Sequence, residues 1–159
     1  SEAVTAWRQA VHSEPGHFSA LRDLGMALLQ EGKNDEALTL FREVLAVQEG
    51  ILGAEHPRSL RTKSYLAFVL KHIGKMDDSV AMYRELLPVQ EQVLGTEHPD
   101  TLTTKHNLAA VLSNQGKNDE ALKLFREVLA VQERVLGAEH PDTLATKSWV
   151  VKIEKKLKL

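Results

Sequence analysis

A repeat of 42 residues constrains this chain more than any other feature of its sequence. Two series of glycines recur at that step, as do an aspartate, an aromatic residue and a His-Pro pair. The series are Gly32, Gly74 and Gly116; Gly53, Gly95 and Gly137; Asp35, Asp77 and Asp119; Phe41, Tyr83 and Phe125; and His56-Pro57, His98-Pro99 and His140-Pro141. Segments 32–60 and 116–144 differ at only five positions, which indicates duplication. A period of this length predicts stacked structural units.

The apolar residues of each unit are spaced as on one face of an α-helix. In the first complete unit they are Leu24, Leu28, Ala37, Leu38, Phe41, Val44 and Leu45, with charged residues between them. Two helices of about 17 residues, each ~25 Å long, fit into one period. Because a single helical hairpin cannot bury its own apolar face, we expect the hairpins to stack into an all-α solenoid.

Proline and glycine predict where the helices begin and end. The proline of each His-Pro pair suits the first turn of a helix, where its missing N–H is harmless. The first glycine series is expected to end that helix in the left-handed conformation. The aspartate series is expected to supply the N-caps of the second helix, and the second glycine series to end it. Pro88 replaces Ala46 and Ala130 inside a second helix, which predicts a kink or a shortened helix near Leu87.

These motif positions resemble the tetratricopeptide repeat (TPR). Leu24-Gly25, Leu28, Ala37 and Phe41 match it in the first complete unit. The later matches are Leu66-Ala67, Leu70, Ser79 and Tyr83, then Leu108-Ala109, Leu112, Ala121 and Phe125. The 42-residue period and the Leu-Gly-x-Glu-His-Pro element at 94–99 resemble the kinesin light chain type. The resemblance implies a right-handed superhelical α-solenoid of antiparallel helix hairpins, acting as a non-catalytic scaffold for protein–protein interactions.

The repeat boundaries divide a single predicted domain, 1–159. Residues 2–13 resemble a second helix without its first, as in a piece of a longer protein. Three complete repeats follow at 15–53, 57–95 and 99–137, and 141–159 forms a C-terminal capping helix. Its lysines are Lys152, Lys155, Lys156 and Lys158. They would give this helix the polar outer face that a terminal cap requires.

The resemblance also implies where a partner binds, because in this family the first helix of each hairpin lines the concave surface. The implied peptide-binding residues are Arg22, Met26, Leu29, Arg61, Ser64, Tyr65, Phe68, Lys71, His106, Asn107, Asn114 and Lys152. Large apolar side chains beside hydrogen-bonding groups, such as Met26 and Phe68, are typical of peptide anchors. The alternative is that these two pack between adjacent first helices. The four cations favour an acidic partner segment.

Composition argues against several other functions. The net charge of −2 provides no general attraction to nucleic acid. No apolar run approaches the ~20 residues of a membrane span, so we expect a cytoplasmic protein that contacts no membrane. The absence of cysteine excludes thiolate metal sites and cysteine nucleophiles. No set of nucleophile, base and orienting residue can be named, so neither an enzyme nor a cofactor is expected.

Three histidines could suggest a metal site, but their spacing argues against it. His56, His98 and His140 occur once per unit, so stacking would separate them by about 10 Å. Zinc needs its ligands at about 2 Å from one point. We therefore expect these histidines to start helices.

Two functions are compatible with this sequence. The first is a module that holds a partner peptide or helix in its concave groove. The second is a structural or self-associating segment of a larger regulatory protein. In the second case the apolar end around Val4, Trp7 and Val11 stacks on another molecule, which makes the chain a monomer or an end-to-end dimer.

Overall fold

The computed structural model describes residue 5 and residues 18–158, and between Phe18 and Leu157 these form seven helices. No strand occurs in this described part of the chain. The predicted half repeat at 2–13, with Val4, Trp7 and Val11, lies outside it except for Thr5. Two compact units divide the chain, Ser1–Lys75 and Met76–Leu159.

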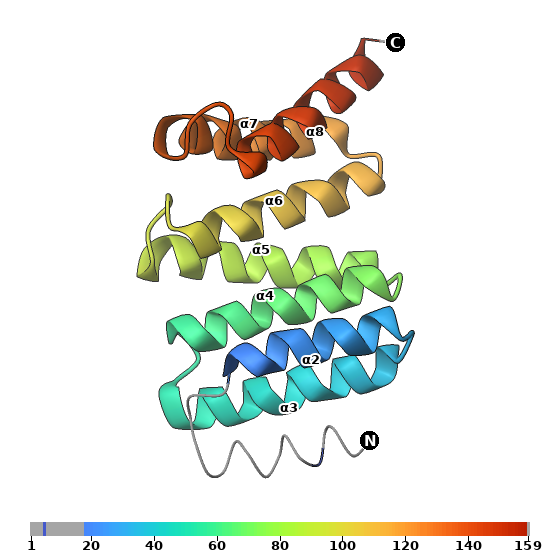
Figure 1. The fold of residues 1–159 in the computed structure, drawn as a ribbon, viewed down its shortest axis with the longest axis vertical. Coiled ribbons are helices and arrows are strands. Elements are labelled where there is room, and N and C mark those ends of the chain that lie inside the picture. The colour runs from blue at the N-terminus through green and yellow to red at the C-terminus, as the bar shows by residue number, and fades with distance from the viewer. Residues whose placement is uncertain (1–4, 6–17, 159) are drawn as a thin grey trace. The chain divides into compact units, whose positions relative to one another are not determined.

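The N-terminal unit contains α2 (Phe18–Gln30), α3 (Asn34–Leu52) and α4 (Pro57–His72). Successive helices run in opposite directions, and α3 packs against both α2 and α4 (Figure 1). Leu21, Leu40, Phe41 and Leu60 are among the fully buried core residues. The motif glycine, Gly25, lies directly under the ring of Phe41, and a Cβ atom at this position would overlap the ring. A small residue is therefore needed where the two helices of a hairpin meet.

The C-terminal unit contains α5 (Met76–Val93), α6 (Pro99–Asn114), α7 (Asn118–Val135) and α8 (Pro141–Leu157). Here α6 packs between α5 and α7, and α8 packs against α7 (Figure 1). The largest core side chains are Tyr83, Phe125, Leu112 and Ile153. The prediction of an all-α fold of antiparallel helices is confirmed. None of the helices described is long and apolar enough to cross a membrane.

The His-Pro pairs start helices as predicted. Each proline begins its helix, and the histidine before it has extended backbone geometry and is the N-cap. The Nδ1 atoms of His56, His98 and His140 accept hydrogen bonds from the backbone N–H groups two residues later, at 3.1–3.2 Å. The imidazole thus satisfies a donor that the helix itself cannot. Among the described residues no cluster of three metal-ligating side chains occurs.

The first glycine series ends helices as predicted. Gly74 has φ 83° and Gly116 has φ 80°, in the left-handed region that favours glycine. At the end of α4 the N–H of Gly74 donates to the carbonyl of Lys71, and the N–H of Lys75 donates to that of Leu70. This pair of bonds is the Schellman arrangement, which satisfies two carbonyls at the helix end.

The prediction that Asp35, Asp77 and Asp119 are N-caps is wrong. These aspartates lie inside the first turn, because α3 begins at Asn34, α5 at Met76 and α7 at Asn118. The reason is the tightness of the turn. Lys33 donates its N–H to the end of α2, and its carbonyl accepts the N–H of Ala37 in α3. In the first turn the carboxylates still interact favourably with the helix dipole.

Pro88 does not shorten its helix, so that alternative of the prediction is wrong. The helix α5 continues through Pro88 and has 18 residues, as many as α7. Pro88 is exposed, so water can bind the carbonyl of Arg84, which loses its helical donor. A bend at this point stays a prediction.

Candidate functional site

In the N-terminal unit, two of the predicted residues meet across α2 and α4. Arg22 forms an ion pair with Asp23 at 2.9 Å. The Asp23 carboxylate, and after it the Tyr65 hydroxyl, raise the pKa of Arg22. The Tyr65 ring in turn packs on Phe41, with ring centroids 5.9 Å apart. Arg22 is therefore exposed and held between Asp23 and Tyr65.

Phe68 lies at the centre of a second group, on the last turns of α4. The ring of His72 is 4.2 Å from that of Phe68, and the ammonium of Lys71 lies 5.9 Å from the Phe68 centroid. Burial lowers the pKa of Lys71. The half-buried Phe68 is thus flanked by the polar side chains of Lys71 and His72. This part of α4 therefore presents an apolar ring beside a cation.

The remaining predicted residues of this unit differ in exposure. Met26 and Leu29 on α2 are half-buried, and Arg61 on α4 is exposed. Ser64 is only 7% exposed. The predicted residues of α4 therefore include both surface and interior positions.

In the C-terminal unit, His106 and Asn107 point to different neighbours. His106 Nδ1 lies 3.2 Å from Thr146 Oγ1 on α8, and its ring meets Phe125 edge-on at 5.1 Å. Asn107 is half-buried and interacts with Tyr83. Asn114 is exposed and is the last residue of α6.

Three of these contacts follow one rule of the repeat. Each motif aromatic residue is contacted by the residue 24 positions later, on a first helix. The pairs are Phe41 with Tyr65, Tyr83 with Asn107, and Phe125 with Trp149. Trp149 stacks on Phe125 at 5.4 Å, and the Lys152 ammonium lies 5.0 Å from the Trp149 centroid. Tyr65 and Asn107 therefore also contribute to packing.

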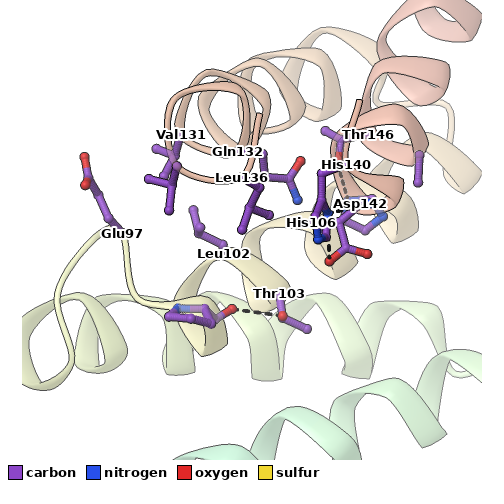
Figure 2. Close-up of a pocket in the computed structure, with 13 residues that line it drawn as sticks. Glu97, Leu102, Thr103, His106, Val131, Gln132, Leu136, His140, Asp142 and Thr146 are labelled. Atoms are coloured by element: carbon purple, nitrogen blue, oxygen red, sulfur yellow. Dashed lines mark hydrogen bonds and ion pairs between the residues drawn. The ribbon is translucent and has the colours of Figure 1, made fainter. Parts of the chain in front are cut away.

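A pocket of about 500 Å³ opens in the C-terminal unit between the first turns of α6, the end of α7 and the first turns of α8 (Figure 2). Its apolar wall consists of Leu102, Val131, Val135, Leu136 and Ala145, and its polar groups come from Glu97, Thr103, His106, Gln132, His140, Asp142 and Thr146. Val135 is 61% exposed and Leu136 is 44% exposed. Apolar side chains that are this exposed beside hydrogen-bonding groups are typical of a binding surface.

Of the two carboxylates at the mouth of this pocket, Glu97 is paired with a cation within the chain. Glu97 forms an ion pair with Arg134 of α7. Asp142 lies 3.9 Å from His140, whose Nδ1 caps α8. Thr103 donates its hydroxyl to the carbonyl of Pro99 at 2.9 Å. The pocket therefore offers mainly apolar area, and the fully buried Thr146 contributes through its contact with His106.

Of the predicted binding residues, only His106 lines this pocket. The end of α7 and its C-cap residue, from Val131 to Leu136, are not among the predicted residues. The signal was present in the period, because a 42-residue repeat is longer than the ordinary TPR of about 34 residues and leaves room for a longer second helix. Lys152 lies elsewhere, in a shallow hollow along α8.

Comparison with known proteins agrees with the geometry. The sequence profile of the tetratricopeptide repeat matches residues 18–58, 59–100 and 101–142. Among solved structures, a Podosopora anserina kinesin light chain protein with nearly identical TPR-like repeats is similar, with 29% identity and a TM-score of 0.81. The match covers 88% of this chain and 66% of that one. Comparison with curated protein sequences finds no match.

Two further structures share the fold at lower identity. BtubC (BKLC) from P. vanneervenii has 23% identity and a TM-score of 0.77, with 91% of this chain and 59% of that one covered. The type III secretion translocator chaperone SycD of Yersinia enterocolitica has 14% identity and a TM-score of 0.66, with 92% and 89% covered. This chain spans less than two thirds of the kinesin light chain protein and of BtubC.

Proposed function

The chain belongs to the tetratricopeptide repeat family and is a protein-interaction scaffold, and from this premise we propose that it binds an extended segment of a partner protein through the pocket beside α6 and α8. The observation that carries this proposal is the 500 Å³ pocket itself, whose wall includes the exposed Val135 and Leu136. Its volume is that of a site for one or two large side chains.

The partner contributes an apolar anchor side chain that is buried against Leu102, Val131 and Leu136. Burying one leucine- or phenylalanine-sized side chain is worth roughly 1.5–3 kcal/mol. Half-buried polar side chains of the lining, such as Gln132 and His106, can hydrogen-bond the partner's backbone (Figure 2). In this arrangement the buried apolar area of the anchor side chain provides the affinity. The polar groups orient the partner segment.

In the N-terminal unit, the predicted residues of α2 and α4 are proposed to bind an acidic segment. Arg61 is exposed, and Lys71 lies beside the apolar ring of Phe68. A cation next to an aromatic ring suits a carboxylate that follows or precedes an apolar side chain. Met26 and Leu29 would extend the apolar part of this surface.

A displayed random peptide library, panned on the immobilised chain, tests the pocket. The peptide that is enriched most is synthesised with a fluorescent label, and its affinity is measured by anisotropy. Ala145→Trp fills the pocket from an exposed position on α8, and we expect it to weaken binding by about tenfold or more, which is about 1.4 kcal/mol. The matched control is Ala81→Trp, which changes an exposed alanine on α5 that does not line the pocket.

Circular dichroism of both variants controls for folding. Equal affinity of the peptide for parent and Ala145→Trp, with Ala81→Trp also unchanged, would refute the pocket as the binding site. In that case Phe68→Asp with Arg61→Glu tests the surface of the N-terminal unit with the same peptide. Loss of binding in this double variant, with helicity preserved, would assign the peptide to that surface.

A further inference from the structure

The outer face of α8 combines apolar and basic side chains in one stripe. Leu144 is 45% exposed and Val151 is 42% exposed. With them, Lys147, Ser148, Lys152, Lys155 and Lys156 line a shallow hollow of about 620 Å³. None of the residues that line it is acidic. These residues define the outer face of α8, and the pocket described above uses other residues of this helix.

The register of the repeat shows what the outer face lacks. Residues of α6 and α8 that are 42 apart occupy equivalent positions. Four such positions are buried in both helices: Thr101/Thr143, Thr104/Thr146, Leu108/Val150 and Val111/Ile153. Four others are buried in α6 and exposed in α8: Lys105/Lys147, Ala109/Val151, Ala110/Lys152 and Ser113/Lys155. Among the helices that the structure describes, both pack on a preceding helix and only α6 packs on a following one. The second set therefore marks the surface that a following helix covers.

The contacts of Lys105 show which chemistry covers such a surface. Its ammonium lies 2.8 Å from a carboxylate oxygen of Glu91 on α5 and 3.4 Å from one of Glu127 on α7. Lys105 is nearly buried there, 8% exposed. The α7 partner of this lysine is therefore an acidic residue on the covering helix. Lys147 occupies the same position on α8.

We propose that the outer face of α8 docks an acidic amphipathic helix, in the register that α7 takes on α6, with a carboxylate of that helix bound to Lys147. Charge complementarity supports this occupant, because four lysines line the hollow and no acidic residue does. The apolar residues of the docked helix cover Leu144 and Val151. A second copy that used the same face would bring lysines against lysines, which is unfavourable.

Val151 adds a size requirement for the docked helix. Its equivalents are Gly25, Ala67 and Ala109. At Gly25 the Phe41 ring of the partner helix occupies the space of a Cβ atom. A valine adds two methyl groups beyond an alanine, so a helix with an aromatic residue at the Phe41 position collides with Val151. The docked helix therefore carries a small residue there, unlike the second helix of an ordinary repeat.

Two labelled peptides test this proposal. Both have the sequence of residues 118–135 with Lys123→Glu and Arg126→Glu, which makes them strongly acidic. The aromatic probe keeps Phe125, and the small probe carries Phe125→Ala. Anisotropy measures their affinity for the full chain. We expect the small probe to bind at least about tenfold more tightly than the aromatic probe, and Val151→Ala in the chain to improve binding of the aromatic probe by about tenfold.

Lys147→Glu in the chain is expected to weaken binding of the small probe by about tenfold or more. The matched control is Lys123→Glu in the chain, which makes the same charge change on the exposed surface of α7. Equal effects of Lys147→Glu and Lys123→Glu on binding of the small probe would overturn the proposal. It would also be overturned if the two probes bound the parent equally well and bound Val151→Ala equally well. Binding to vesicles with anionic lipid but to neither peptide would overturn it too, because it would make the outer face a membrane surface.

Discussion

Replacing Tyr83 by phenylalanine removes one oxygen atom from the centre of the C-terminal unit. Phe41 and Phe125 occupy the equivalent positions of the other repeats. The Tyr83 side chain is fully buried, and its hydroxyl has no hydrogen-bond partner among the described residues. Burial raises the pKa of Tyr83, and the nearby Asn107 side chain offsets only part of this rise because it lies outside good hydrogen-bond geometry.

The magnitude has two parts. A buried hydroxyl without a partner lowers the free energy of unfolding by roughly 1–3 kcal/mol. Its removal leaves a small void, which lowers the free energy of unfolding of the variant by about 1 kcal/mol. We therefore expect Tyr83→Phe to raise the free energy of unfolding by about 1 kcal/mol at neutral pH. A tyrosine in the unfolded chain ionises near a pKa of about 10, whereas the folded-state pKa of Tyr83 is raised.

The sign of the pH dependence follows from that difference. The stability contributed by keeping Tyr83 protonated is fully present below pH about 10 and is lost as the pH rises toward the folded-state pKa. At pH about 11, one unit above the unfolded value, the parent has lost about 1.4 kcal/mol through Tyr83. The advantage of Tyr83→Phe should therefore grow from about 1 to about 2.4 kcal/mol.

Urea unfolding followed by circular dichroism at both pH values measures this difference. The control is Tyr65→Phe, which removes a tyrosine whose ring is only half-buried. Comparing each variant with the parent at the same pH cancels the titration of all other groups. A loss of stability in Tyr83→Phe at neutral pH, or an advantage that does not grow with pH, would refute the reasoning.

Three further predictions concern single side chains. His98→Ala should lower the free energy of unfolding by about 1 kcal/mol in thermal denaturation, because a side-chain acceptor caps α6. His98→Asn should restore most of this loss. Equal losses in the two variants would contradict the capping role. Burial lowers the pKa of Lys105, but Glu91 and then Glu127 outweigh it and raise the pKa overall. The stability that these two contacts contribute should therefore be present below pH about 10.4 and decline above it. Lys105→Met should abolish this alkaline decline in urea unfolding. An unchanged decline would contradict the role of Lys105. Pro88→Ala should raise the unfolding free energy by roughly 1–3 kcal/mol, because α5 already passes through this position; an unchanged midpoint in urea would show that α5 tolerates the proline without cost.

Much of the fold could be predicted because its signals are local. A proline suits only the first turn of a helix, a glycine adopts positive φ without strain, and a repeat places the same residues at the same positions. The helix ends at Gly74 and Gly116, the helix starts at the His-Pro pairs and the tetratricopeptide fold follow from these rules. The prediction of aspartate N-caps was wrong because Lys33, which ends α2 with its N–H bond, already lies next to the first residue of α3.

The candidate site was less predictable because it depends on contacts between distant segments. His106 could be named from its motif position, but the pocket beside it requires the end of α7 to meet the starts of α6 and α8. Likewise, Ser64 and Arg61 are both polar residues of one helix, yet one is buried and the other exposed.

The sequence by itself determined the period, the helices, the helix ends at the His-Pro pairs and the first glycine series, and the family, because each rests on the backbone preferences of single residues repeated along the chain. Only the tertiary structure decided which of those residues form a surface. Lys105 and Lys147 hold the same place in the repeat, but Lys105 is nearly buried between Glu91 and Glu127, while Lys147 lies on the outer face of α8. The difference arises because burial depends on which helix packs alongside, and no local preference encodes that neighbour.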